Sequence, residues 1–412
     1  MRAFRIAALP LLLVSFIGCT DDSRSPVGVD LLPGGILEGG LQVITLTTLD
    51  RAEDFEVFPA GRGTADRLVT ARSWPEEPGI ESRALVRFSL SSLDTLPEGA
   101  EIVGAGIRLV FVPVDQPITF HLHVITDFWS EEAATWERRD FGEPWTTPGG
   151  DFEAAPVATF TIQPTAPDTA RADSVAFADS VRVSLPASLV EAWRSETTLN
   201  AGLILIQETP GEAVAFPSAA GLNPLGPRLD VDVLLEDPGS LAFVQRIQAE
   251  EDTFIVDDPG SLPPGGLAVS AGDPLRRTFL VHSLEGVPPG ATVVEAQLIV
   301  SPDGVRIPGD SLFLSLNQVL GEFREENTIL GTTLGVVSLA AGEAPDSLVF
   351  QSGALTSRVR QWLRDPESNE GVILSVQDED TAFGEVRLFG PDAAILLRPR
   401  IRLVLFPPPL PS

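Results

Sequence analysis

The segment Arg83-Ala-Leu-Val-Arg-Phe-Ser-Leu90 decides the fold, because apolar residues fall at every second position, as in a half-buried β-strand. It also occurs twice. The second copy reads Arg277-Thr-Phe-Leu-Val-His-Ser-Leu284. A strand motif repeated at such a distance predicts two structural units built on one plan.

Further matches flank the two copies of this segment in the same order. They pair Glu53-Asp54-Phe55 with residues 251–254, residues 97–105 with 288–296, Trp129-Ser130-Glu131 with Phe323-Arg324-Glu325, Asn200-Ala201-Gly202 with Asn369-Glu370-Gly371, and Pro227-Arg228 with Pro399-Arg400. The order predicts a first domain at residues 41–236 and a linker at 237–244. A second, degenerate copy is expected at 245–406, followed by a Pro-rich tail at 407–412.

The fold class follows from short strand-like segments between turns. Alternating segments begin at Leu41, Ile102, Ile118 and Ala201, and the 36 Pro and 36 Gly suit many turns. This pattern predicts an all-β sandwich or barrel. Each copy also has one short amphipathic stretch, and the apolar stripes of these stretches include Trp193 and Trp362. We expect both indoles to lie in the core.

The N-terminus predicts export and lipid anchoring. Arg2 and Arg5 precede an apolar run, which is too short to span a bilayer and ends in Phe16-Ile17-Gly18-Cys19. This ending resembles the lipobox of bacterial lipoproteins. It implies a signal peptide at 1–18, acyl chains on Cys19, a tether at 19–40, and attachment to the outer membrane or cell surface. The alternative is an ordinary cleaved signal in which Cys19 is incidental.

Composition and motifs exclude several classes of function. A formal net charge of −30 disfavours nucleic acid and anionic membrane surfaces as partners. The chain has no nucleophile elbow, no zinc-protease helix motif and no phosphate-binding loop, so we predict a protein that is not an enzyme. A polysaccharide hydrolase or lyase is the least favoured alternative, because its paired carboxylates need not be close in sequence.

The order of the repeated motifs resembles the DNRLRE-domain family of secreted and cell-surface proteins. Residues 83–90 and 129–136 carry its most specific parts. The second copy departs from the pattern, with His282 where the first has Phe88 and Ile329 where the first has Trp136. The resemblance covers most of residues 41–406. It implies two tandem jelly-roll-like β-sandwich domains, and some members of the family are carbohydrate-binding modules.

Candidate contact residues lie in loops that the two copies do not share. Trp74 and Trp145 have no counterpart in the second copy, and Arg138 and Arg139 lie close to Trp145 in sequence. Loops on a rigid scaffold commonly carry recognition. We therefore predict binding of extracellular polysaccharide through these four residues. The alternative is a non-catalytic structural, assembly or adhesion scaffold that contacts surface proteins.

Trp129, Glu131 and Trp136 have two interpretations. They form either a glycan platform or, as we favour, a structural corner in which Trp129 closes the sandwich and Glu131 binds loop amides.

Metal sites are possible but disfavoured, and no cofactor is predicted. His121 and His123 share one strand face, although a metal site needs three or four ligands. Ca²⁺ could bind at Asp257-Asp258 or Asp378-Glu379-Asp380. We favour the interpretation that these acidic residues are solvated side chains in loops, because no known Ca²⁺ loop motif is present.

Overall fold

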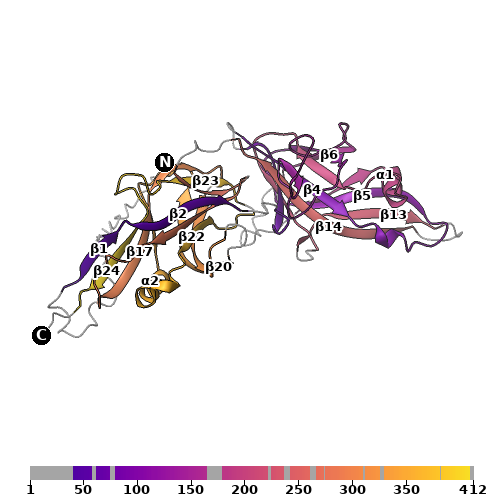
Figure 1. The fold of residues 1–412 in the computed structure, drawn as a ribbon. Coiled ribbons are helices and arrows are strands. Elements are labelled where there is room, and N and C mark those ends of the chain that lie inside the picture. The colour runs from indigo at the N-terminus through magenta and orange to yellow at the C-terminus, as the bar shows by residue number, and fades with distance from the viewer. Residues whose placement is uncertain are drawn as a thin grey trace, which may run out of the picture.

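The computed structural model describes residues 40–57, 62–74, 79–164, 179–220, 224–235, 242–259, 266–272, 274–309, 311–324, 329–380 and 382–408. These residues form two β-sandwiches that lie end to end, each with one α-helix (Figure 1). The predicted all-β, sandwich-like fold is confirmed. The predicted signal peptide, Cys19, nearly all of the tether, residues 236–241 and residues 409–412 lie outside the described residues.

The first sandwich, here called the first module, spans described residues between 62 and 257. One layer has the order β10-β5-β13-β14 and the other β14-β4-β11-β6-β9, while β3 pairs with β4 and β12. Its elements are β3 (Arg67–Trp74), β4 (Ile80–Phe88), η3 (Ser91–Leu93), β5 (Glu101–Phe111), β6 (Ile118–Val124), β7 (Arg138–Asp140), β8 (Glu143–Pro144), β9 (Ala158–Ile162), β10 (Asp179–Leu185), α1 (Ala187–Arg194), β11 (Leu203–Gln207), β12 (Val214–Pro217), β13 (Arg228–Leu234) and β14 (Phe243–Asp257).

The second module repeats this plan. One layer has the order β1-β24-β17-β21, and the other contains β2, β16, β22, β19 and β20 with β15, β23 and β18. Its elements are β1 (Gln42–Leu46), β2 (Leu49–Glu56), β15 (Leu267–Ala271), β16 (Arg276–His282), β17 (Thr292–Val300), β18 (Pro302–Arg306), β19 (Ser311–Leu320), β20 (Ile329–Ala340), β21 (Leu348–Gln351), α2 (Gly353–Arg364), η5 (Pro366–Ser368), β22 (Val372–Val376), β23 (Gly384–Leu388) and β24 (Arg400–Phe406).

The two repeats exchange their first strands. β14 opens the second repeat in sequence, yet it pairs with β13 and β4 of the first. Reciprocally, β1 and β2 open the first repeat but pair with β24 and β16 of the second. In Figure 1 the indigo β1 and β2 accordingly lie in the module formed mostly by the C-terminal half. The strand pairing thus departs from the boundaries predicted at 41–236, 237–244 and 245–406.

Buried polar contacts favour the exchanged pairing in the first module. Asp252 of β14 is 1% exposed, and its carboxylate accepts hydrogen bonds from the Ser218 hydroxyl at 2.6 Å and the Ala219 N–H at 2.7 Å. Burial raises the pKa of Asp252, while these two hydrogen bonds lower it. In β2, Ala52 occupies the equivalent place opposite Leu280 and has no carboxylate. Returning β2 to the first module would leave Ser218 without this partner.

Aromatic packing favours the exchange in the second module. Phe55 of β2 is buried in a cluster with Phe279, Val319 and Ile373, and its ring centroid lies 5.1 Å from that of Phe323. The predicted match of Phe55 with Phe254 is off by one residue. Phe55 stands opposite Arg277 and Ile255 stands opposite Arg83, so Phe55 corresponds to Ile255. A shift of one residue changes the face of a strand, and Phe254 therefore lies in the main core instead.

The repeated Asn-x-Gly motif has a local structural cause. The Asn200 amide donates to the Phe88 carbonyl at 2.9 Å, and the Asn369 amide donates to the His282 carbonyl at 3.0 Å. Gly202 has φ of +89°, and a Cβ there would lie 2.2 Å from the Val86 carbonyl oxygen. Only glycine fits such a conformation and approach. The motif thus fixes the end of the Arg-led strand in both modules.

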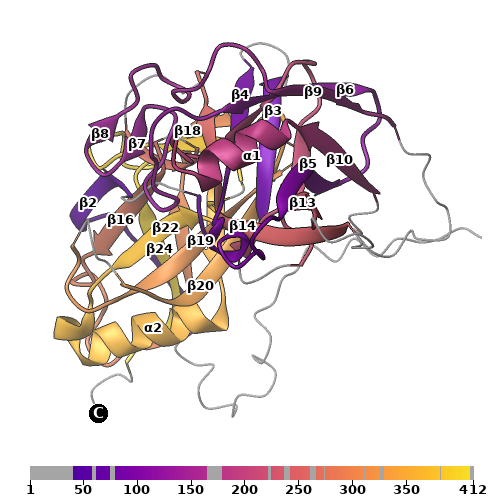
Figure 2. The ribbon, with the colours of Figure 1, turned by 90° about the vertical axis from the view of Figure 1, so that its right-hand side faces the viewer.

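The two helices close the sandwiches. α1 packs against β5 (Figure 2), and α2 packs against β17. Trp193 is 3% exposed and Trp362 is 4% exposed, as expected for the apolar stripes. Ser352 caps α2 by accepting a hydrogen bond from the Leu355 N–H. The helix ends at Arg364, before Pro366, which cannot continue it.

Candidate functional site

Trp145 does not form an exposed platform. Its side chain is 4% exposed, and the indole N–H donates to the Thr135 carbonyl at 2.9 Å. It packs in a small apolar cluster on the outer face of the β4–β11 sheet, together with Trp129 and Trp136. A buried indole offers no ring face to a sugar, so the prediction that Trp145 contacts a ligand is wrong.

Trp74 lies where the two modules meet. Its ring is 5.9 Å from that of Phe383 in an edge-to-face arrangement. Beside it, Arg62 is 5% exposed, lies over the Phe254 ring at 4.9 Å and donates to the Asp380 carbonyl at 2.6 Å. These contacts give Trp74 a packing role at the junction.

Arg138 and Arg139 are engaged in ion pairs. Arg138 lies 3.6 Å from Glu56 of the exchanged β2. Arg139 lies 3.3 Å from Asp127 and 3.5 Å from Glu143. The structure therefore does not bring Trp74, Trp145, Arg138 and Arg139 together as one binding site.

Trp129, Glu131 and Trp136 form a packed corner. The Trp129 indole N–H donates to the Ala201 carbonyl at 2.9 Å, and Arg83 lies 4.5 Å above the Trp136 ring. Glu131 accepts a hydrogen bond from the Asp252 N–H at 3.1 Å, which is an amide of strand β14 and not a loop amide as predicted. Burial raises the pKa of Glu131, although this hydrogen bond acts in the opposite direction. The loop that contains Trp129, Glu131 and Trp136 therefore binds β14, the strand that the second repeat supplies to the first module.

A groove of about 480 Å³ opens beside this corner. It is lined by Arg83, Thr126, Asp127, Thr146, Thr147, Pro148, Gly150, Asp151 and Phe152. All but Arg83 belong to the long stretch between β6 and β9, which also holds Trp145, Arg138 and Arg139. The groove is lined mainly by polar residues, with Phe152 as its aromatic side chain, and it is the candidate site in the first module.

The carboxylates of this groove are held by backbone amides. Asp151 accepts hydrogen bonds from the Thr146 N–H at 2.8 Å and the Thr147 N–H at 3.0 Å. Asp127 accepts from the Phe128 N–H at 2.9 Å. Each carboxylate oxygen can accept further hydrogen bonds. The groove thus presents fixed acceptors, together with the hydroxyl groups of its threonines.

Arg83 stabilises the groove wall. Its guanidinium donates to Glu81 at 2.9 and 2.6 Å and to the Gly149 carbonyl at 2.7 Å. Through these hydrogen bonds and its contact with the Trp136 ring, the Arg83 guanidinium is already bound by groups of the protein itself. Arg83 therefore orders the loop and leaves little positive charge for an anionic ligand.

Exposed aromatic side chains accompany the groove in the same stretch of chain. Phe128 and Phe141 are each 49% exposed, and Phe152 is half-buried in the groove wall. Sequence reasoning missed all three because it favoured tryptophan. The available signal was their position in the long stretch between β6 and β9, where Trp145, Arg138 and Arg139 also lie.

The histidine pair has structural partners. The Nε2 of His121 lies 3.0 Å from Glu208, and Nδ1 of His123 lies 2.8 Å from the Glu153 carbonyl oxygen. Burial lowers the pKa of His123.

Two of the five candidate Ca²⁺ residues form ion pairs with arginines. Asp258 pairs with Arg306 at 2.6 Å, and Glu379 pairs with Arg277 at 2.6 Å. Within the described ranges, no three His, Cys, Asp or Glu side chains gather as metal ligands would.

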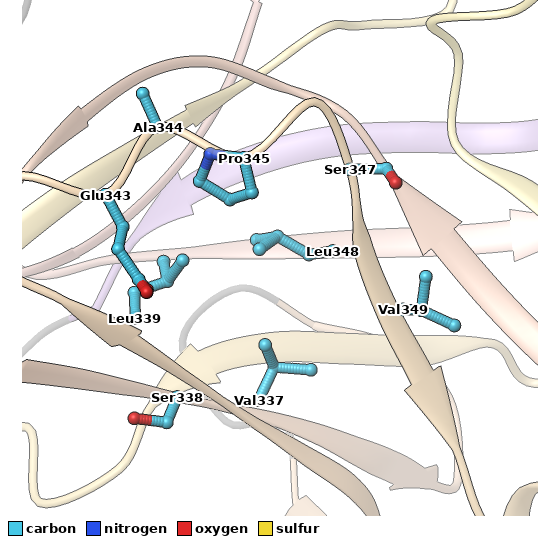
Figure 3. Close-up of a pocket in the computed structure, with 9 residues that line it drawn as sticks. All are labelled: Val337, Ser338, Leu339, Glu343, Ala344, Pro345, Ser347, Leu348 and Val349. Carbon is cyan, nitrogen blue, oxygen red and sulfur yellow. The ribbon is translucent and has the colours of Figure 1, made fainter. Parts of the chain in front are cut away.

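A second groove, of about 510 Å³, lies in the second module between the end of β20 and the start of β21 (Figure 3). Its lining is mainly aliphatic: Val337, Ser338, Leu339, Glu343, Ala344, Pro345, Ser347, Leu348 and Val349. The Glu343 carboxylate accepts from the Ala340 N–H at 2.8 Å and so closes the turn. With no aromatic ring and one engaged carboxylate, this groove suits a polar ligand less well than the first.

Comparisons with known proteins add no functional information. No family model matches the chain, and no curated protein matches it. A solved structure of the Macrobrachium rosenbergii nodavirus covers 98% of this chain and 96% of its own, at 11% identity and a TM-score of 0.19. A TM-score that low carries no argument. The resemblance to the DNRLRE-domain family stays a prediction. Among the helices of the described residues, none has the length and hydrophobicity to cross a membrane.

Proposed function

We propose that this chain is a non-catalytic cell-envelope lipoprotein, anchored by acyl chains on Cys19, whose first module binds extracellular polysaccharide. The observation that carries the proposal is the groove of Asp127, Asp151 and the threonines, in the same loop region as exposed Phe128 and Phe141. Sugars are recognised by hydrogen bonds to hydroxyl groups and by contact with aromatic faces. This loop region offers both kinds of contact.

The charge of the site favours a neutral glycan. Asp127 and Asp151 line the groove, while Arg83 is already paired with Glu81. The whole chain carries a formal charge of −30. A polymer of uronic acids would be repelled by this field unless a cation bridged the carboxylates.

We expect the double substitution Phe128→Ala/Phe141→Ala to weaken polysaccharide binding by roughly tenfold or more, since aromatic contacts contribute about 1 kcal/mol each. Unmodified affinity should be modest, about 10–100 µM. Calorimetry on the full chain with Cys19→Ser, against a panel of neutral and acidic polysaccharides, measures both. Phe313→Ala is the matched control, because Phe313 is 44% exposed in the other module. Binding equally strong in the double variant would refute the site.

A scaffold at the cell surface is the second candidate function. The observation that favours it is the strand exchange, which makes each module dependent on a strand from the other repeat. Such a chain resists separation of its modules. Absence of binding across the whole polysaccharide panel would favour this role over the first.

A further inference from the structure

The N-terminal arm, defined as residues 42–57 with β1 and β2, is an integral part of a module that it does not adjoin in sequence. β1 pairs with β24 along Gln42–Leu46, and β2 pairs with β16. Leu46 lies in the second module's main core, and Phe55 fills its outer aromatic cluster. Without the arm, β24 and β16 would each lose a hydrogen-bonded neighbour.

The arm is joined to the first module by a short connection. Residues 58–61 separate Val57 from Arg62, which is anchored at the junction by the Glu379 and Asp380 carbonyls. The Val57 N–H still donates to Leu275 of the second module at 2.9 Å. Among the described residues, the ion pair of the arm with the first module is Glu56 with Arg138, at 3.6 Å. The arm is thus bound chiefly by the acceptor strands.

We propose that the arm also completes the second module of another copy of this chain, giving a strand-exchanged dimer. A second copy offers the identical donor and the identical acceptor, so reciprocal exchange preserves every strand contact seen within one chain. The closed dimer leaves neither acceptor empty. The two forms therefore differ mainly in the entropy of association, and this inference does not depend on the glycan groove.

Concentration decides between the two forms. Only four residues, 58–61, connect the arm to Arg62, and a linker that short corresponds to an effective concentration on the order of 1 mM for the arm beside its own acceptor. Monomer should dominate well below that value, and dimer should become comparable near it. Crowding of anchored copies on a membrane moves the balance toward the dimer.

Two single-cysteine chains, both with Cys19→Ser, test the exchange. One carries Val43→Cys in the arm, and the other carries Val404→Cys, at the position directly opposite on β24. Neither chain can form this disulfide alone.

The chains are mixed, unfolded in denaturant, refolded together and oxidised. A 43–404 disulfide between copies should form at about 1 mM and fall about a hundredfold at about 10 µM. The control replaces the first chain with Val103→Cys, since Val103 is 49% exposed on β5 of the first module and Val43 is 51% exposed.

A second measurement covers the case in which a substitution prevents folding. The Cys19→Ser chain, without any change in a strand, is refolded at about 1 mM and then diluted. Light scattering along the dilution series should give an average mass that rises toward that of a dimer at about 1 mM and returns to that of the monomer at about 10 µM. A 43–404 yield no higher than that of the control pair, or monomer alone in the scattering measurement, would overturn the proposal.

Discussion

Replacing Trp362 with Ala is expected to lower the free energy of unfolding by about 3–5 kcal/mol, the usual effect of truncating a buried large aromatic. Trp362 is 4% exposed on α2 and packs with Leu355, Val359 and the strands of the second core. The surrounding strands are fixed by their hydrogen bonds and cannot collapse into the vacated space. Trp193→Ala in the first module should cost a similar amount, since Trp193 is 3% exposed.

Denaturant unfolding followed by circular dichroism measures these losses. Trp362→Phe and Trp193→Phe are the matched controls, because they keep an aromatic side chain in place and should cost much less. The expectation fails if the Ala and Phe variants are equally stable.

The second large effect is a dependence of stability on pH through His282. The side chain is 3% exposed, and among the described residues its Nε2 has no hydrogen-bond partner. Burial lowers the pKa of His282 to about 4, although a hydrogen bond to the backbone of Pro399 acts in the opposite direction. The folded protein thus keeps this imidazole neutral at pH values where the unfolded chain protonates it.

The direction in which stability changes with pH follows from proton binding. Between the unfolded pKa of 6.5 and the folded value of about 4, only the unfolded chain binds the proton, so stability falls as the pH is lowered. The full contribution of neutral His282 to the free energy of unfolding is present above the pKa of the unfolded chain, and about 3 kcal/mol of it is lost by pH 4.

The matched variant is His282→Phe, because the first repeat has the fully buried Phe88 at this position. Its unfolding free energy should lack this pH-dependent component between pH 7 and pH 4. An identical slope in both proteins would contradict the assignment.

Much of the architecture was predictable from the sequence, because strand alternation and the repeated motifs follow local rules. The two Arg-led strands, the Asn-x-Gly turns and the indoles of the apolar stripes all have equivalent places in both modules. Each of these features depends on residues close in sequence or on burial of one face.

The strand exchange could not be predicted from the repeat alone. Matching segments show which strands are equivalent, but either repeat can supply an equivalent strand. What decides the pairing is long-range chemistry, in which Asp252 meets Ser218 and Phe55 meets Phe279 and Phe323. Neither contact leaves a signal in local periodicity.

The candidate site was predictable only to the level of a loop region. The stretch between β6 and β9, which holds the predicted Trp145, Arg138 and Arg139, also supplies every groove residue except Arg83. Choosing residues within it by type was less successful. The Trp145 indole is buried and donates a hydrogen bond to the Thr135 carbonyl. The exposed aromatic side chains of this loop region are Phe128 and Phe141. Large indoles have more apolar surface to bury than phenyl rings, so tryptophan in a long loop often serves packing.

The exchange of first strands is the central claim, and an engineered disulfide tests it most directly. Arg87 of β4 stands opposite Glu251 of β14. If each repeat kept its own first strand, Arg87 would stand opposite Arg51 instead, because Arg51 faces Val281, the residue equivalent to Arg87 in the second repeat.

Two chains in the Cys19→Ser background compare these pairings: Arg87→Cys/Glu251→Cys and Arg51→Cys/Arg87→Cys. Facing residues of paired strands lie within the Cα separation that a disulfide bridges. At micromolar concentration, peptide mass mapping after oxidation should find the 87–251 disulfide within one chain and no 51–87 disulfide. The reverse result would contradict the exchanged fold.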